Sequence, residues 1–219
     1  RSASTVDIAP ACAVLAAWDG VYDLDRAGPV VWREMMSQLN APELRNQGRL
    51  WAEPFDPKHP VDTPSGLAPA PPDGPDPILQ FLAGTVQTLQ AAGLPVDVTL
   101  GDAQFALRHG TKVPIHGGNN FDGTTNVVGF GAPGSILDPA FDETKRELVA
   151  PNSQLAHVGS DTGYLVNTGT SFLMALAFTD DGPQARGFLD YSNTEDRTDP
   201  NYLEATQRYS AKDWRTVAW

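Results

Sequence analysis

Histidine side chains are the first groups in this sequence that could do chemistry. The four histidines are His59, His109, His116 and His157, and none has metal-ligand spacing such as HExxH or a CxxC partner. His116 lies in a glycine-rich loop close to Asp122, which would allow an acid/base pair. The favoured interpretation is a loop histidine whose ring bonds to the backbone. The sequence therefore predicts no metal site.

Two further motifs resemble catalytic or phosphate-binding elements. Gly117 and Gly118 could line a phosphate, but the Lys-Ser/Thr of a P-loop and the third glycine of a dinucleotide turn are missing. We therefore expect turn geometry there. Ser171 follows Gly169 and Thr170 as in a nucleophile elbow, but the G-x-S-x-G frame is absent and a strand pattern follows. Ser171 is therefore predicted to be a strand residue.

The remaining candidates are a serine near the amino terminus and two acidic pairs. Ser2 could become an N-terminal nucleophile with its own α-amine as base, but Arg1 blocks that role. Asp180-Asp181 and Glu195-Asp196 could hold calcium if several carboxylates converged, although solvated turns are the simpler interpretation. We predict no catalytic residue, metal ligand or cofactor in this chain, and substrate-binding residues stay unassigned.

The composition is that of an acidic chain with enough apolar residues to build a core. The 219 residues are 41% hydrophobic and carry a formal net charge of -12. This charge argues against nucleic-acid or anionic-membrane partners, because both require clustered Lys and Arg. No apolar run approaches the roughly 20 residues of a membrane span, and no signal-peptide pattern opens the chain. The single cysteine, Cys12, excludes an intrachain disulfide and is expected in the core.

Periodic apolar residues predict four main helices. In the first, Asp7 is the expected cap, and Cys12, Leu15 and Trp18 would share the buried face. In the third, Asp76 is the expected N-cap. The four helices are expected at about residues 8–18, 29–40, 77–93 and 202–209, with shorter helical patterns at 102–108 and 143–148.

The stretch Gly163–Asn193 predicts a buried β-hairpin. Residues 171–178 are almost uniformly apolar, and residues 179–183 supply turn chemistry. A solvent-facing strand would carry polar residues at every second position, so an interior strand of a larger sheet is expected. Residues 125–130 are a further candidate strand. Residues 51–77 are crowded with proline and predict an extended wrap without regular pairing.

Several short motifs occur in an order typical of one family. They are LAAWDG at 15–20, VPIHGG at 113–118, GTSF at 169–172, GP at 182–183, DYSN at 190–193, PNY at 200–202, and Tyr209-Ser210 with Trp214. In this order they resemble the C-terminal part of the β subunit of the penicillin acylase family. The most similar branch is that of acyl-homoserine-lactone acylases and aculeacin A acylase.

The resemblance implies an α+β chain that forms a portion of a four-layer αββα N-terminal nucleophile hydrolase. Residues 1–219 would be one C-terminal β-subunit portion: helical 1–50, a proline-rich excursion 51–77, helix and loops 78–160, and a sheet-completing hairpin with the last helix at 161–219. In the family the nucleophile is the first Ser of the β subunit, after autocleavage. That Ser and the oxyanion Asn would lie upstream, and Ser2-Ala3 does not match the Ser-Asn context. No catalytic residue is therefore carried onto this chain.

The function implied is that of part of an amidohydrolase. It would cleave the amide between a fatty or aromatic acyl chain and a polar head group, as in an acyl-homoserine lactone, lipopeptide or β-lactam. The partners would be the α subunit and the N-terminal part of the β subunit, and the location secreted or periplasmic. Two alternatives stay open: a stand-alone ligand-binding or structural domain using residues 116–122, and an independent serine hydrolase using Ser171 and His116.

Overall fold

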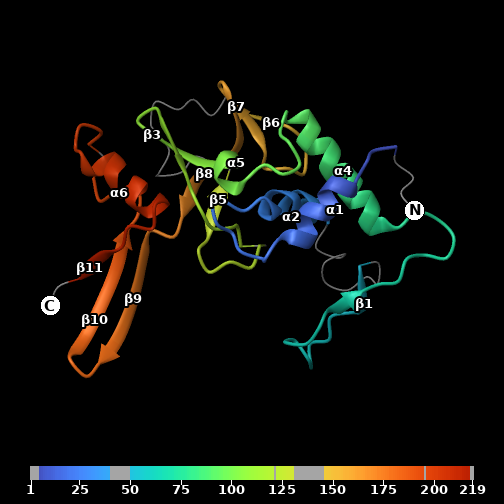
Figure 1. The fold of residues 1–219 in the computed structure, drawn as a ribbon, viewed down its shortest axis with the longest axis horizontal. Helices are drawn as coiled ribbons and strands as arrows, with labels where there is room; N and C mark the ends of the chain where they lie inside the picture. Colours follow the sequence, from blue (N-terminus) through green and yellow to red (C-terminus); the bar gives the residue numbers. More distant parts are fainter. Residues whose placement is uncertain (1–4, 40–49, 121, 131–145, 195, 218–219) are drawn as a thin grey trace. The chain divides into compact units, whose positions relative to one another are not determined.

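The computed structural model describes residues 5–39, 50–120, 122–130, 146–194 and 196–217. The chain forms two compact units, of which unit 1 comprises residues 1–20, 27–98 and 149–153. Unit 2 comprises residues 21–26, 99–148 and 154–219. Helices and strands both occur, as the coarse fold class predicts (Figure 1). None of the helices in the described part of the chain has the length and apolar character of a membrane span.

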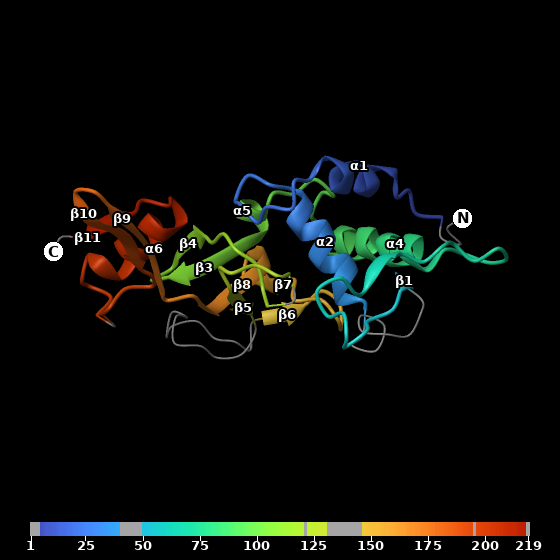
Figure 2. The ribbon, with the colours of Figure 1, turned by 90° about the horizontal axis from the view of Figure 1, so that it is seen from below.

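The described residues of unit 1 contain the helices α1 (Ala9–Ala17), α2 (Gly28–Ser37) and α4 (Pro77–Ala91). Helix α2 packs against both α1 and α4 (Figure 2). Gln38 at the end of α2 donates its amide to the Phe81 carbonyl oxygen at 2.8 Å and to Thr85 Oγ1 at 2.9 Å. Since both acceptors belong to α4, this one side chain fixes the end of α2 against α4.

The predicted cap Asp76 is confirmed, since it accepts from the Ile78 backbone N–H at 2.9 Å. In α1 the N-cap position is Ile8, one residue after the predicted Asp7, although Asp7 accepts from the Ala9 N–H at 3.0 Å. The predicted buried face of α1 is wrong. Cys12 is exposed, and the buried residue of α1 is Ala11. Because α1 is apolar all round, the sequence pattern does not define which face is buried.

The proline-rich stretch contains a short antiparallel pair that the sequence did not predict. Strand β1 (Trp51–Glu53) pairs with β2 (Ser65–Leu67). No proline lies within either strand, so every residue of the ladder keeps its N–H. The intervening loop is closed by Thr63, whose hydroxyl donates to the His59 carbonyl oxygen at 2.7 Å.

Unit 2 contains a six-stranded sheet of order β4-β3-β8-β7-β6, with β5 also pairing β8. Helix α5 (Leu100–Ala103) leads directly into β3, and β3 runs parallel to β8, whereas the other strand pairs are antiparallel. The strands are β3 (Gln104–Arg108), β4 (Thr111–Pro114), β5 (Val128–Phe130), β6 (Arg146–Leu148), β7 (Ala156–Val158) and β8 (Asp161–Gly169).

Two predicted helical segments are wrong where the structure describes them. The helix expected at 102–108 ends at Ala103, and residues 104–108 form β3. Gln104 decides this, because its side chain donates to the carbonyl oxygens of Ile115 at 2.6 Å and Gly117 at 2.9 Å. In the pattern at 143–148, residues 146–148 form strand β6, and 143–145 lie outside the described residues.

A second, three-stranded sheet of order β11-β10-β9 follows. The predicted hairpin is confirmed as β9 (Phe172–Thr179) and β10 (Gly182–Leu189), joined by Asp180 and Asp181. Strand β11 (Arg215–Val217) pairs with β10 after helix α6 (Asn201–Ser210), and the hairpin projects away from the six-stranded sheet (Figure 1). The predicted burial is wrong for this chain: the exposed fraction is 58% at Phe172 and 84% at Phe178.

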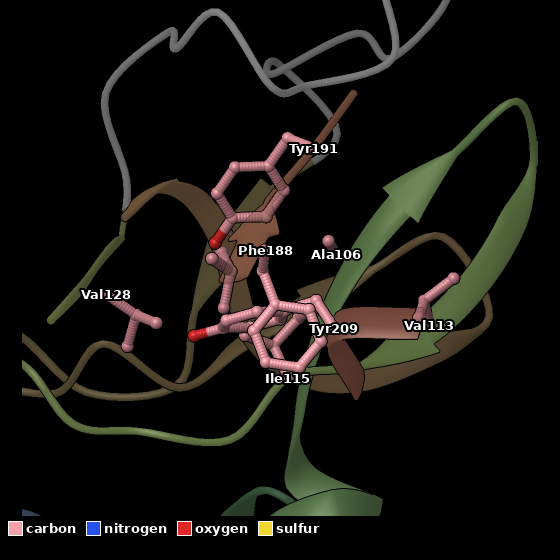
Figure 3. Close-up of a cluster of buried hydrophobic side chains, with 8 residues drawn as sticks. Ala106, Val113, Ile115, Val128, Phe188, Tyr191 and Tyr209 are labelled. Atoms are coloured by element: carbon pink, nitrogen blue, oxygen red, sulfur yellow. The ribbon is translucent and has the colours of Figure 1, made fainter. Parts of the chain in front are cut away.

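A buried cluster joins the six-stranded sheet to β10 and α6 (Figure 3). Tyr209 of α6 is fully buried and meets Phe188 of β10 edge-on, with ring centroids 5.9 Å apart. The cluster comprises Ala106, Val113, Ile115, Val128, Val166, Phe188, Tyr191 and Tyr209. This cluster therefore includes the base of the hairpin but not its exposed tip.

Gly163→Ala is expected to destabilise unit 2. A Cβ at residue 163 would lie 2.2 Å from the Ala103 carbonyl oxygen and 2.9 Å from Phe105 Cε1. Relieving that overlap should lower the free energy of unfolding by about 1–3 kcal/mol, measured by chemical denaturation. Ser160→Ala, at an exposed position nearby, is the control. Equal stabilities of the two variants would contradict the expectation.

Candidate functional site

A buried polar cluster in unit 2 is formed by His116, Asn126 and Tyr209. His116 Nε2 lies 2.9 Å from the Tyr209 carbonyl oxygen, and Asn126 Nδ2 lies 2.8 Å from His116 Nδ1. The Tyr209 hydroxyl donates to Asn126 Oδ1 at 2.5 Å. The His116 and Tyr209 rings stack with centroids 4.4 Å apart. Helix α6 is thereby connected to the loop that follows β4.

This arrangement sets the protonation state of His116. The Tyr209 hydroxyl fixes the oxygen side of the Asn126 amide, so the amide nitrogen must donate to Nδ1. Nδ1 is then an acceptor, and the ring proton sits on Nε2, where it bonds the carbonyl oxygen. Burial lowers the pKa of His116, in agreement with a neutral ring. Both nitrogens of His116 are occupied. The predicted backbone bond is made by Nε2, whereas Nδ1 bonds the Asn126 side chain, which the prediction did not include.

The backbone N–H groups of Gly117 and Gly118 in the glycine-rich loop are hydrogen-bonded within the protein. The Gly117 N–H donates to the Tyr22 carbonyl oxygen at 3.0 Å, and the Gly118 N–H lies within bonding distance of Thr124 Oγ1 and the Asn126 carbonyl oxygen. Asp122 accepts from the Asn119 N–H at 2.7 Å and returns its own N–H to the Asn119 side chain. The loop therefore adopts turn geometry, as expected. Asp122 is not among the groups hydrogen-bonded to the His116 ring.

A second buried cluster joins β3 to the end of β10 and the start of α6. Arg108 donates to the Tyr191 carbonyl oxygen at 2.5 Å and to the Tyr202 carbonyl oxygen at 3.1 Å. Its guanidinium lies 3.9 Å from the centroid of the Tyr202 ring. Asp190 is 3% exposed and accepts from the Tyr191 N–H at 2.5 Å. These contacts hold the chain where it leaves β10.

Asp190 is the most unusual ionisable group described. Its Oδ2 atom is buried without a hydrogen-bond partner among the described residues. Burial raises the pKa of Asp190 to about 8, against the opposing effect of Arg108. Tyr191 and Ser192, which follow it, have φ values of 61° and 82°, a conformation that costs free energy in side-chain-bearing residues. From the sequence, this segment stood out only as the DYSN motif.

Of the other sequence candidates, Ser171 bonds the second cluster through its backbone, because its carbonyl oxygen accepts from the Asp190 N–H. Ser171 is exposed and directly precedes β9, so the prediction that it is a strand residue is wrong by one position. Both ring nitrogens of His116 are hydrogen-bonded to Asn126 and Tyr209, so neither is available to Ser171 as a base. Asp180 and Asp181 form the exposed hairpin turn, whereas Ser2 and Glu195 lie outside the described residues. Within the described ranges, no three His, Cys, Asp or Glu side chains come together as a possible metal site.

One face of the three-stranded sheet carries exposed apolar side chains that are not part of the core. Alternate residues of a strand share a face, and residues paired across strands share it too. The registers therefore place six exposed apolar side chains on one face: Phe172, Met174, Leu176, Phe178, Leu189 and Val217. We call this set the apolar face. Arg215, which pairs with Gly187, lies on the same face at the β11 side. Exposed apolar side chains gathered in this way are typical of an interaction site.

The comparisons with known proteins decide the family. The family model described as penicillin amidase matches residues 2–219. The chain belongs to the penicillin amidase family. The acyl-homoserine lactone acylase PvdQ of Pseudomonas syringae pv. syringae (strain B728a) is 30% identical over 211 residues, and the aculeacin-A acylase of Actinoplanes utahensis is 27% identical over 221 residues. These alignments cover 96% and 98% of this chain but 23% and 22% of the relatives.

The match confirms the resemblance and sets its extent. This penicillin amidase family chain spans under a quarter of the length of the two relatives. The buried clusters at His116 and Arg108 connect helix to sheet, and their polar groups bond mainly to backbone. These two clusters stabilise the fold. The exposed apolar face is the candidate functional surface of this chain.

Asn126→Asp should raise the pKa of His116. A carboxylate oxygen would face Nδ1 in place of the amide N–H, so the protonated ring becomes the better bonded state. The pKa is measured by NMR titration of the imidazole nitrogens. Asn119→Asp adds the same charge in the same loop and is the control, because its side chain bonds the Asp122 N–H. An unchanged His116 pKa in Asn126→Asp would count against the assigned tautomer.

Asp190 should make stability fall as pH rises. The unfolded carboxyl ionises above its ordinary value of 3.8, whereas the folded carboxyl keeps its proton up to about pH 8. The native state thus binds more protons across this window, and the free energy of unfolding declines from about pH 4 to pH 8. Asp190→Asn should flatten that decline in melting temperatures measured across the range. An identical pH profile in the variant would refute the assignment.

Proposed function

We propose that this chain is part of an acylase that cleaves the amide between a fatty or aromatic acyl chain and a polar head group. The candidate substrates are acyl-homoserine lactones, lipopeptides and β-lactams. The family match over residues 2–219 supports this proposal, because two relatives in that family are named as acylases. The nucleophile would be an N-terminal Ser on a polypeptide outside these residues, with its own α-amine as base.

The observation that carries the proposal is the apolar face. A free-standing domain rarely exposes six large apolar side chains on one face of a sheet. The matched relatives are more than four times as long as the aligned region, so the rest of an acylase offers the cover. The apolar face therefore favours a partial chain over a stand-alone ligand-binding domain.

The proposal extends to the fold, the processing and the location of the complete acylase. The two sheets would be parts of a four-layer αββα fold, completed by the α subunit and the N-terminal part of the β subunit. Autocleavage would release the catalytic Ser, and the enzyme would act in the periplasm or outside the cell. This chain would stabilise the sheets and shape the rim of the site, and it would be inactive alone.

Leu176→Lys should reduce the amount of assembled, active acylase. In the complete enzyme the ammonium would be buried without a partner at the apolar face, at a cost of several kcal/mol, which corresponds to a loss of about 100-fold or more. Fatty-acid release from acyl amides by the complete enzyme is the measurement. Gln184→Lys is the matched control, since Gln184 is an exposed residue of β10 on the other face. Absence of acyl-amide hydrolysis by the complete enzyme would refute the proposed function.

A further inference from the structure

Strand β9 forms an edge of its sheet that is unlike the other edges described in unit 2. The order β11-β10-β9 leaves one side of β9 without a partner strand among the described residues. Its eight residues, FLMALAFT, include no charge, proline or glycine. Exposed sheet edges are normally short, charged or interrupted by proline, because an unprotected edge pairs with other chains.

Strand β5, which pairs only with β8, has three residues and contains a glycine, and three other edge strands of unit 2 are short and charged. Strand β4 carries Lys112 and ends at Pro114, and β6 has three residues, two of them Arg146 and Glu147. Strand β11 also has three residues and begins with Arg215. Each of these three strands is short and polar enough to stay an edge. Strand β9 has the length and composition of an interior strand.

The register shows which backbone groups of β9 face outward. The turn has two residues, so its flanking pair, Thr179 and Gly182, is a hydrogen-bonded pair. Bonded and non-bonded pairs then alternate, which places Pro183 opposite Phe178 in a non-bonded pair. Proline has no N–H, so this assignment costs no ladder hydrogen bond. The N–H groups that point away from β10 are those of Phe172, Met174, Leu176 and Phe178.

We propose that β9 is an interior strand in the complete acylase, where a strand from outside these 219 residues pairs with its free edge. This inference rests on the proposed function. The four outward N–H groups and the carbonyl oxygens of the same residues would bond the added strand. Its own apolar side chains would extend the apolar face. The added strand is therefore recognised by backbone pairing together with alternating apolar residues.

The rest of the acylase is a better occupant than a second copy of this chain. Two copies pairing edge to edge would bring together chains that each carry a formal charge of -12, which opposes their association. The relatives also contain more than three quarters of their length outside the aligned region. A strand from that part of the acylase would pair with β9 without bringing in a second copy of this chain.

Hydrogen exchange in the complete acylase tests the pairing residue by residue. We expect the outward amides of Met174 and Leu176 to exchange as slowly, within about tenfold, as the inward amides of Ala175 and Ala177. The inward amides bond β10 and serve as the internal reference. Outward amides that exchange more than about 100-fold faster than the inward ones, in an enzyme that hydrolyses acyl amides, would overturn the pairing and leave the proposed function intact.

Met174→Pro provides a second test. Proline is tolerated at an edge strand when its missing N–H points to solvent, but not inside a sheet. We expect this variant to lower the yield of assembled acylase about tenfold or more, while Met174→Leu, which keeps the N–H and nearly the same volume, stays within about twofold. Normal yield of Met174→Pro would refute interior pairing. An assembly that contains two copies of this chain paired through β9 would refute the chosen occupant.

Discussion

Tyr209 makes the contacts on which the described structure of unit 2 depends. One fully buried side chain stacks on His116, meets Phe188 edge-on, and donates its hydroxyl to Asn126. Its backbone carbonyl oxygen accepts from the same histidine. Helix, loop and hairpin base are therefore fixed by a single residue, so a shift in any one of them would break contacts in the other two.

The second buried cluster uses the same physical device with a charged group. Arg108 sits in the interior because its guanidinium has backbone carbonyl oxygens and an aromatic ring around it. A buried cation bonded in this way fixes the direction of the chain at Tyr191 and Tyr202. The buried polar clusters at His116 and Arg108 thus position the three-stranded sheet. Their role in the described residues is structural.

The sequence was sufficient wherever local signals decide the structure. Asp76-Pro77 fixed the start of a helix, and the turn at Asp180-Asp181 fixed the hairpin. It was insufficient where tertiary contacts decide: Gln104 bonds the carbonyl oxygen of Ile115, eleven residues away in the loop after β4, and no local pattern shows this. The burial of residues 171–178 was predicted from their apolar composition, and the structure exposes Phe172, Met174, Leu176 and Phe178 in this chain. Asp190 gave no signal as an isolated carboxylate, because its burial comes from elements distant in sequence.

The division of the chain into two units has a consequence for how the protein can be cut. The boundaries fall after residues 20, 26, 98, 148 and 153, so neither unit is one continuous segment. A truncation near residue 98 would strip unit 2 of residues 21–26, whose carbonyl oxygens at Leu24 and Arg26 accept from the first residues of α5. The units therefore cannot be exchanged between relatives as modules by a single crossover.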